Sequence, residues 1–107
     1  MMTIMVKTRL KDGSECAECQ QMTKLLEERG LWHKIDFIVW ADEQDPKSEG
    51  MRLAKQHHVE TAPFYIVKAL DRDTVYTSTL QLIRDHFQAE VPAELRHEQG
   101  PEEIGLA

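Results

Sequence analysis

The stretch Ser14-Glu15-Cys16-Ala17-Glu18-Cys19 contains the only two cysteines of the 107-residue chain. It lies where a strand-like segment gives way to a helix-like one, so Cys16 is expected at a helix N-terminus and Cys19 one turn further in. Positions i and i+3 share a helix face, and the two sulfurs can therefore meet in one disulfide. Unpaired N–H groups and the positive end of the helix dipole favour a thiolate at Cys16. A Cys-x-x-Cys pair at such a junction predicts a redox-active dithiol.

Length, composition and charge restrict the class of protein. A chain of this length forms one domain, and 41% hydrophobic with 30% charged residues is ordinary for a globular protein. The net charge of −6 comes without a basic stripe, which argues against a nucleic-acid partner. No apolar run approaches the roughly 20 residues of a membrane span, and the first residues lack the pattern of a signal peptide. With so few cysteines, a cytoplasmic location and a catalytic or redox-sensing pair are expected.

The segments around the two cysteines predict alternating strands and helices. Residues 3–10 predict a strand that is central in its sheet, because Met5 adds apolar surface to its second face. Residues 15–29 predict a helix capped by Ser14 or Cys16, and Gly30 stands where a left-handed residue commonly ends a helix. Residues 35–40 are almost wholly apolar, which is typical of a strand buried on both faces, and the two strands are expected to be parallel.

The second half of the chain predicts two more helices and a hairpin. Pro46 suits the first position of a helix over about 46–58. Pro63 cannot donate to a strand ladder, so it marks the start of a third strand, and residues 73–76 predict a fourth strand antiparallel to the third. A last helix is expected over 79–89. We therefore expect one domain over residues 1–91 and an acidic, mostly disordered tail over 92–107, either solubilising or docking a partner.

Two motifs in this order of elements carry a resemblance to a known family. With Cys16 and Cys19 opening the first helix and Thr61-Ala62-Pro63 opening the third strand, residues 3–89 resemble the thioredoxin fold, and within it the glutaredoxin branch. The resemblance implies an α/β fold with a mixed four-stranded sheet in the order 2-1-3-4, flanked by three helices. It also implies a cis peptide bond before Pro63, which would face the cysteines; the alternative is a proline that only starts a strand.

The same resemblance implies a thiol–disulfide oxidoreductase of redox homeostasis. Cys16 would attack as the thiolate, and Cys19 would resolve the mixed disulfide. The implied substrate-binding residues are Thr61, Ala62, Pro63 and Lys11. Substrates would be protein disulfides or glutathione mixed disulfides, with glutathione or a system of the thioredoxin-reductase type as electron donor. A monomer without a bound cofactor or metal is expected.

Two carboxylates lie beside the cysteine pair. Glu15 and Glu18 oppose the helix dipole, because nearby negative charge disfavours a thiolate. Glutaredoxins usually have Pro-Tyr where this chain has Ala17-Glu18, so Glu18 predicts a more reducing potential than theirs.

The sequence also allows other interpretations. The two cysteines could be packing residues, half of a zinc site, or ligands of an iron–sulfur cluster bridged between two subunits. The domain could also be a non-catalytic binding module that keeps the fold and uses its groove to hold a partner.

Overall fold

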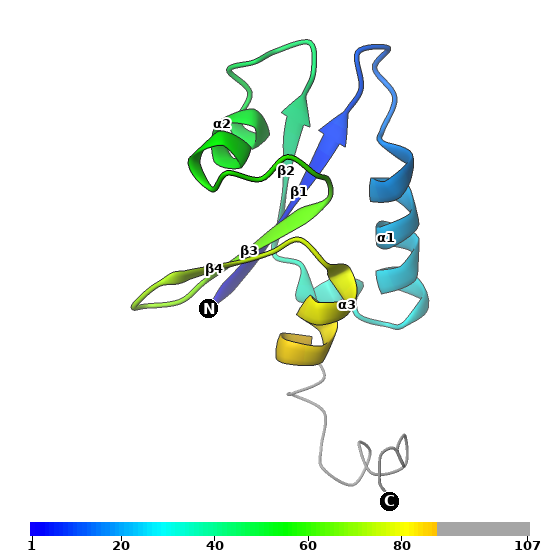
Figure 1. Ribbon diagram of the computed structural model, residues 1–107. Coiled ribbons are helices and arrows are strands. Elements are labelled where there is room, and N and C mark those ends of the chain that lie inside the picture. Colours follow the sequence, from blue (N-terminus) through cyan, green and yellow to red (C-terminus); the bar gives the residue numbers. More distant parts are fainter. Residues whose placement is uncertain (88–107) are drawn as a thin grey trace, which may run out of the picture.

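The computed structural model describes residues 1–87, and its four strands form one mixed sheet (Figure 1). The strands are β1 (Met2–Arg9), β2 (Phe37–Asp42), β3 (Phe64–Lys68) and β4 (Asp73–Tyr76), in the order β2-β1-β3-β4. β1 pairs in parallel with β2 and antiparallel with β3, and β3 pairs antiparallel with β4. The predicted sheet order and the central position of the first strand are confirmed.

Three helices cover the two faces of this sheet. They are α1 (Ala17–Glu28), α2 (Glu49–Gln56) and α3 (Thr79–Leu82), which continues into a wider π-helical turn over Ile83–Phe87. α1 and α3 lie on one face and α2 lies on the other (Figure 1). The arrangement is a three-layer α/β sandwich in which every helix has sheet to pack against.

The core has one part on each face of the sheet. Met5 and Val6 are neighbours in β1, and both are buried, with exposed fractions of 0% and 1%. Because side chains alternate along a strand, Met5 packs under α1 and α3 while Val6 packs under α2. β1 is therefore apolar on both faces, as its sequence predicts.

The first helix begins two residues later than predicted. Cys16, not Ser14, is the N-cap, and no side chain caps the helix. Ser14 instead donates its backbone N–H and its hydroxyl to the Asp12 carboxylate, which holds the turn before the helix. Gly30 has a φ of +71°, so it takes the predicted left-handed conformation just beyond the helix.

The second helix begins at Glu49, so the prediction of a start at Pro46 was wrong. The cause is a turn that occupies the preceding residues. The Asp45 side chain accepts the N–H of Lys47 at 2.9 Å, and its carbonyl accepts the N–H of Ser48 at 3.0 Å. Asp45 thus holds Pro46 inside the turn, and Ser48 becomes the N-cap.

Gly50 allows α2 to lie directly against β2. A Cβ atom at this position would stand 2.3 Å from the backbone nitrogen of Ala41 and 2.4 Å from the carbonyl carbon of Trp40. Only glycine fits this contact without a backbone shift.

The prediction that the second strand is buried on both faces was wrong. β2 lies at the edge of the sheet, and Phe37 and Ile38 keep 56% and 38% of their surface exposed. Its start is held by Asp36, whose carboxylate accepts the Thr3 N–H at 2.8 Å and whose N–H donates to the Thr3 carbonyl at 2.9 Å. The apolar run is therefore only partly covered.

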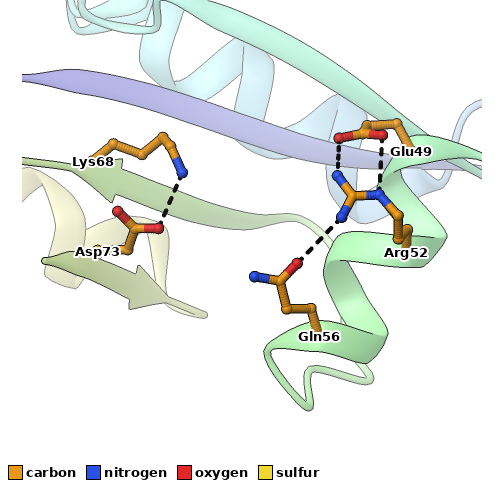
Figure 2. Close-up of polar contacts among 5 residues, drawn as sticks. All are labelled: Glu49, Arg52, Gln56, Lys68 and Asp73. Atoms are coloured by element: carbon orange, nitrogen blue, oxygen red, sulfur yellow. Dashed lines mark hydrogen bonds and ion pairs between the residues drawn. The ribbon is translucent and has the colours of Figure 1, made fainter.

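Polar contacts on the surface reinforce α2 and the β3–β4 hairpin (Figure 2). Arg52 binds the Glu49 carboxylate through two nitrogens and donates to the Gln56 side chain at 3.3 Å. Lys68 and Asp73 face each other across β3 and β4, with Nζ 3.0 Å from Oδ2. Pairs this exposed contribute little, about 0.2–1 kcal/mol each.

The last predicted helix is described as far as Phe87. Ser78 caps α3 by accepting the N–H of Gln81 at 3.2 Å. Residues 88–91 of the predicted domain and the predicted tail over 92–107 lie outside the described residues. No helix within residues 1–87 is long and apolar enough to cross a membrane.

Candidate functional site

The loop that carries the first cysteine is tied to the end of β1. The Cys16 N–H donates to the Thr8 carbonyl at 2.9 Å, and the Leu10 N–H donates to the Ser14 carbonyl at 2.7 Å. Glu15 also forms an isolated antiparallel bridge with Arg9. These contacts hold Cys16 next to the end of β1, immediately before α1.

The two cysteines have different environments. Cys16 is half-buried at the N-cap, whereas Cys19, one turn further along α1, is completely buried with an exposed fraction of 0%. Both thiols are free. An outer, reachable sulfur beside an inner, buried one is the order that the sequence predicted for this pair.

Thr8 holds the inner sulfur as well as the outer residue. Its N–H points to the Cys19 sulfur at 3.3 Å, while its carbonyl accepts the Cys16 N–H. Burial raises the pKa of Cys19 to about 12, and the Thr8 N–H opposes this rise because it favours the thiolate. The negative charges of Cys16 and Glu15 add to the rise in the Cys19 pKa. Cys19 is therefore protonated at neutral pH.

Cys16 opens into a groove with a volume of about 970 Å³. One wall is the face of α1 that runs from Cys16 to Arg29, just beyond the helix. The opposite wall is made by the loop before β3 and by the start of α3. The lining residues on that wall are Thr61, Ala62, Pro63, Thr77, Ser78, Thr79 and Leu80. The Ala62–Pro63 peptide bond is cis.

The groove collects most of the residues that the sequence singled out. Thr61, Ala62, Pro63 and Glu18 line it together with Cys16. Lys11, expected to bind substrate, is exposed in the turn after β1 and does not line the groove. Its carbonyl instead accepts a hydrogen bond from the Gln44 side chain. A different lysine lies against Glu15, the residue before Cys16.

That lysine is Lys7, which the sequence analysis missed as a site residue. Its side chain is only 7% exposed, and its Nζ lies 2.5 Å from Oε2 of Glu15, an oxygen that solvent does not reach. The ammonium also lies 5.1 Å from the ring centre of Trp40 and 6.0 Å from that of Trp32. Glu15 thus turns away from the groove and is held by a buried cation.

A signal for Lys7 was present in the sequence. It lies two residues after Met5 in a strand expected to be central in its sheet, so its side chain must enter the same layer as that of Met5. A lysine in that place is rarely left without a partner. In the structure its partner is Glu15, on the loop that follows the strand.

Tyr65 is a second buried polar residue beside the site. Its hydroxyl is 2.6 Å from Oγ1 of Thr79, and both residues are buried. Burial raises the pKa of Tyr65 to about 12, although the bond to Thr79 opposes this rise. The contact joins β3 to the first residue of α3 and so fixes one wall of the groove.

Within residues 1–87, no group of three or more His, Cys, Asp or Glu side chains is placed to hold a metal ion.

Comparisons with known proteins establish the fold. No family model matches the chain, and no curated protein matches its sequence. A thioredoxin from Thermus thermophilus has a similar structure, with a TM-score of 0.50, 18% identity, and a match covering 84% of this chain and 75% of that one. Thioredoxin f2 from Chlamydomonas reinhardtii was also found, with a TM-score of 0.43, 17% identity and coverage of 85% and 82%. The chain has the thioredoxin fold, as its order of elements predicted.

Proposed function

We propose that this chain is a thiol–disulfide oxidoreductase that works through Cys16 and Cys19. One observation carries the proposal: Cys16 lines the groove at the N-cap of α1, while Cys19 lies buried one turn behind it with its sulfur on the Thr8 N–H. A reachable attacking thiol in front of a buried resolving thiol is the arrangement that thiol–disulfide exchange requires.

The reaction follows from the two positions. The Cys16 thiolate attacks one sulfur of a substrate disulfide, so that a mixed disulfide forms and the other substrate sulfur leaves as a thiolate. Cys19 then loses its proton and attacks the Cys16 sulfur, which releases the second substrate thiol and leaves the Cys16–Cys19 disulfide. Two electrons pass from the dithiol to the substrate. The Thr8 N–H stabilises the Cys19 thiolate during the second step.

Within this class we propose a glutaredoxin-like enzyme of cytoplasmic redox homeostasis that acts as a monomer. The element order from β1 to α3 and the Thr61-Ala62-Pro63 segment beside Cys16 support this narrower assignment. The substrates would be protein disulfides or glutathione mixed disulfides. The oxidised enzyme would be returned to the dithiol by glutathione or by a reductase of the thioredoxin-reductase type.

A titration in glutathione redox buffers tests the proposal. Free thiols are trapped by alkylation at each potential and counted by intact mass. We expect the protein to interconvert between a dithiol and an internal disulfide, and the Cys19→Ser variant to accumulate a mixed disulfide on Cys16. If both thiols stay reduced across the range, or react alike and slowly, the pair is not a redox centre.

The alternative of a binding module predicts a different result. Its partner would bind a Cys16→Ser variant as tightly as the native protein. An iron–sulfur-bridged dimer would instead give a brown protein with visible cluster absorption.

A further inference from the structure

We infer that the groove beside Cys16 is a subsite for an extended polypeptide, which selects an apolar residue near its middle and an acidic residue at its far end. The inference rests on the proposed function, because it takes Cys16 as the reacting group. It narrows the substrate class from any small disulfide to a disulfide within a polypeptide chain.

The first argument is the length of the helical wall. The residues of the α1 wall after Cys16 are Glu18, Met22, Leu25 and Arg29, which are spaced by four, three and four positions and so share one helix face. At about 1.5 Å of rise per residue, the wall from Cys16 to Arg29 is about 20 Å long. An extended chain advances about 3.3 Å per residue, so about six residues fill the groove. A tripeptide such as glutathione would fill about half of it.

The second argument is the chemistry of the middle of the groove. Met22 and Leu25 are only half-buried on α1, and Leu80 opposite them keeps 54% of its surface exposed. They lie about 9–14 Å along the helix from Cys16, which corresponds to the third or fourth residue of an extended chain beyond the reacting cysteine. A large apolar side chain at that position would cover all three.

The third argument is the charge at the two ends. Glu18 and Arg29 are the charged residues that line the groove, the first beside Cys16 and the second at the far end. Neither forms an ion pair with another residue of the described part of the chain, 1–87. Arg29 is therefore available to a substrate carboxylate, while Glu18 disfavours an acid next to the reacting cysteine. A polypeptide whose acid lies about five residues from its cysteine matches both charges.

Chromogenic peptide disulfides test this subsite with the full-length, reduced protein. Each probe is an acetylated, amidated hexapeptide joined through its cysteine to a nitrobenzoate thiol, whose release reports attack by Cys16. The parent sequence is Cys-Ser-Ser-Leu-Ser-Glu, and a reversed peptide covers the opposite chain direction. In two variants of the parent peptide, the leucine is replaced by serine or the glutamate by lysine. Hydroxyethyl disulfide and the glutathione analogue of the probes are measured beside them.

We expect selectivity at both positions. Loss of the leucine should slow attack about five- to tenfold, as expected for an apolar side chain that is only partly covered. Exchange of glutamate for lysine should slow it about three- to tenfold, because the pair with Arg29 is exposed. Arg29→Glu should reverse this last preference. Lys24→Glu, an equal charge change on the exposed side of α1, should leave it as it is. Leu80→Ser should reduce the preference for leucine.

The outcomes separate the subsite from the chemistry. If the protein attacks neither hydroxyethyl disulfide nor any peptide, the proposed function itself fails. If hydroxyethyl disulfide and all peptides react, but the peptide preferences are the same in the native protein and in the Arg29→Glu and Leu80→Ser variants, the chemistry stands and the subsite is refuted. If the glutathione probe reacts faster than every hexapeptide, the substrate class is the tripeptide and the inference is overturned.

Discussion

Replacing Lys7 by methionine should destabilise the protein more than the loss of any other single charged side chain in residues 1–87. The substitution keeps most of the aliphatic length of the side chain but removes the ammonium that lies 2.5 Å from Glu15 and over the Trp40 ring. The Glu15 carboxylate would remain with one oxygen shielded from solvent and without its cation. The perturbation is therefore a buried charge without a partner.

The magnitude follows from the burial of the two side chains. Removing one member of a fully buried ion pair costs about 3–5 kcal/mol of unfolding free energy. Here the Lys7 side chain is 7% exposed but the Glu15 side chain is 24% exposed, so the carboxylate can be partly rehydrated. We expect a loss of about 2–3 kcal/mol for Lys7→Met, including the lost contact with the tryptophan rings. Glu15→Gln should cost less, because the Lys7 ammonium keeps its contact with the Trp40 ring.

Urea unfolding of the reduced protein, followed by tryptophan fluorescence, measures these values. A double-mutant cycle of Lys7→Met and Glu15→Gln should give a coupling of about 1.5–2 kcal/mol, with the double variant more stable than the sum of the two predicts. The same cycle on Lys68 and Asp73, whose side chains are 45% and 34% exposed, is the matched control. Its coupling should be about 0.5 kcal/mol and should shrink in 1 M salt, whereas that of Lys7 and Glu15 should persist.

Two results would refute this reasoning. Additive effects of Lys7→Met and Glu15→Gln would mean that the two side chains are not coupled in the folded protein. Equal salt sensitivity of the two pairs would mean that the contact between Lys7 and Glu15 is solvated.

Three further predictions concern the site and its support. Glu18→Gln should raise the reduction potential by about 10–20 mV, because it removes a charge that opposes the Cys16 thiolate, and an unchanged potential would contradict the role given to Glu18. Burial raises the pKa of Cys19 from an ordinary 9.0 to about 12, so the folded chain keeps a proton that the unfolded chain loses. The reduced protein should therefore lose stability as the pH rises from 9 towards 12, and Cys19→Ser should lose less in urea titrations across that range. Gly50→Ala should cost about 2–3 kcal/mol in the same assay despite its better helix propensity, and Lys55→Ala on the exposed side of α2 should be near neutral.

Local patterns predicted the order of elements along the chain, whereas the sheet order came from the resemblance to the thioredoxin fold. The alternation in β1, the glycine after α1 and the proline before β3 each act within a few residues, and together they placed the strands and helices in the order observed. The predictions for the second helix and the second strand failed for different reasons. Pro46 suits a helix start, but the Asp45 side chain and carbonyl hold it in a turn. Residues 35–40 are apolar enough for a central strand, yet the sheet order, also predicted, puts that strand at an edge.

The candidate site was predicted less completely than the fold. The residues with a motif around them were found: Cys16 and Cys19, and the segment Thr61-Ala62-Pro63, which lines the groove with Cys16. Lys7 and Tyr65 have no motif, and each is marked only by a buried polar contact, Lys7 with Glu15 and Tyr65 with Thr79. The length of the groove could not be predicted from the sequence either, because it depends on how much of the α1 face α3 leaves uncovered.

The structure gives different surroundings to the two carboxylates near Cys16. Glu15 and Glu18 both flank Cys16, and both were expected to oppose its thiolate. Glu15 lies against a buried ammonium, so at Cys16 the two charges largely cancel. Glu18 is exposed in the groove and has no such cation within residues 1–87, so no positive charge offsets its effect on the Cys16 thiolate. The reduction potential should therefore respond more to Glu18→Gln than to the double variant Lys7→Met/Glu15→Gln, which removes both charges of the cancelling pair.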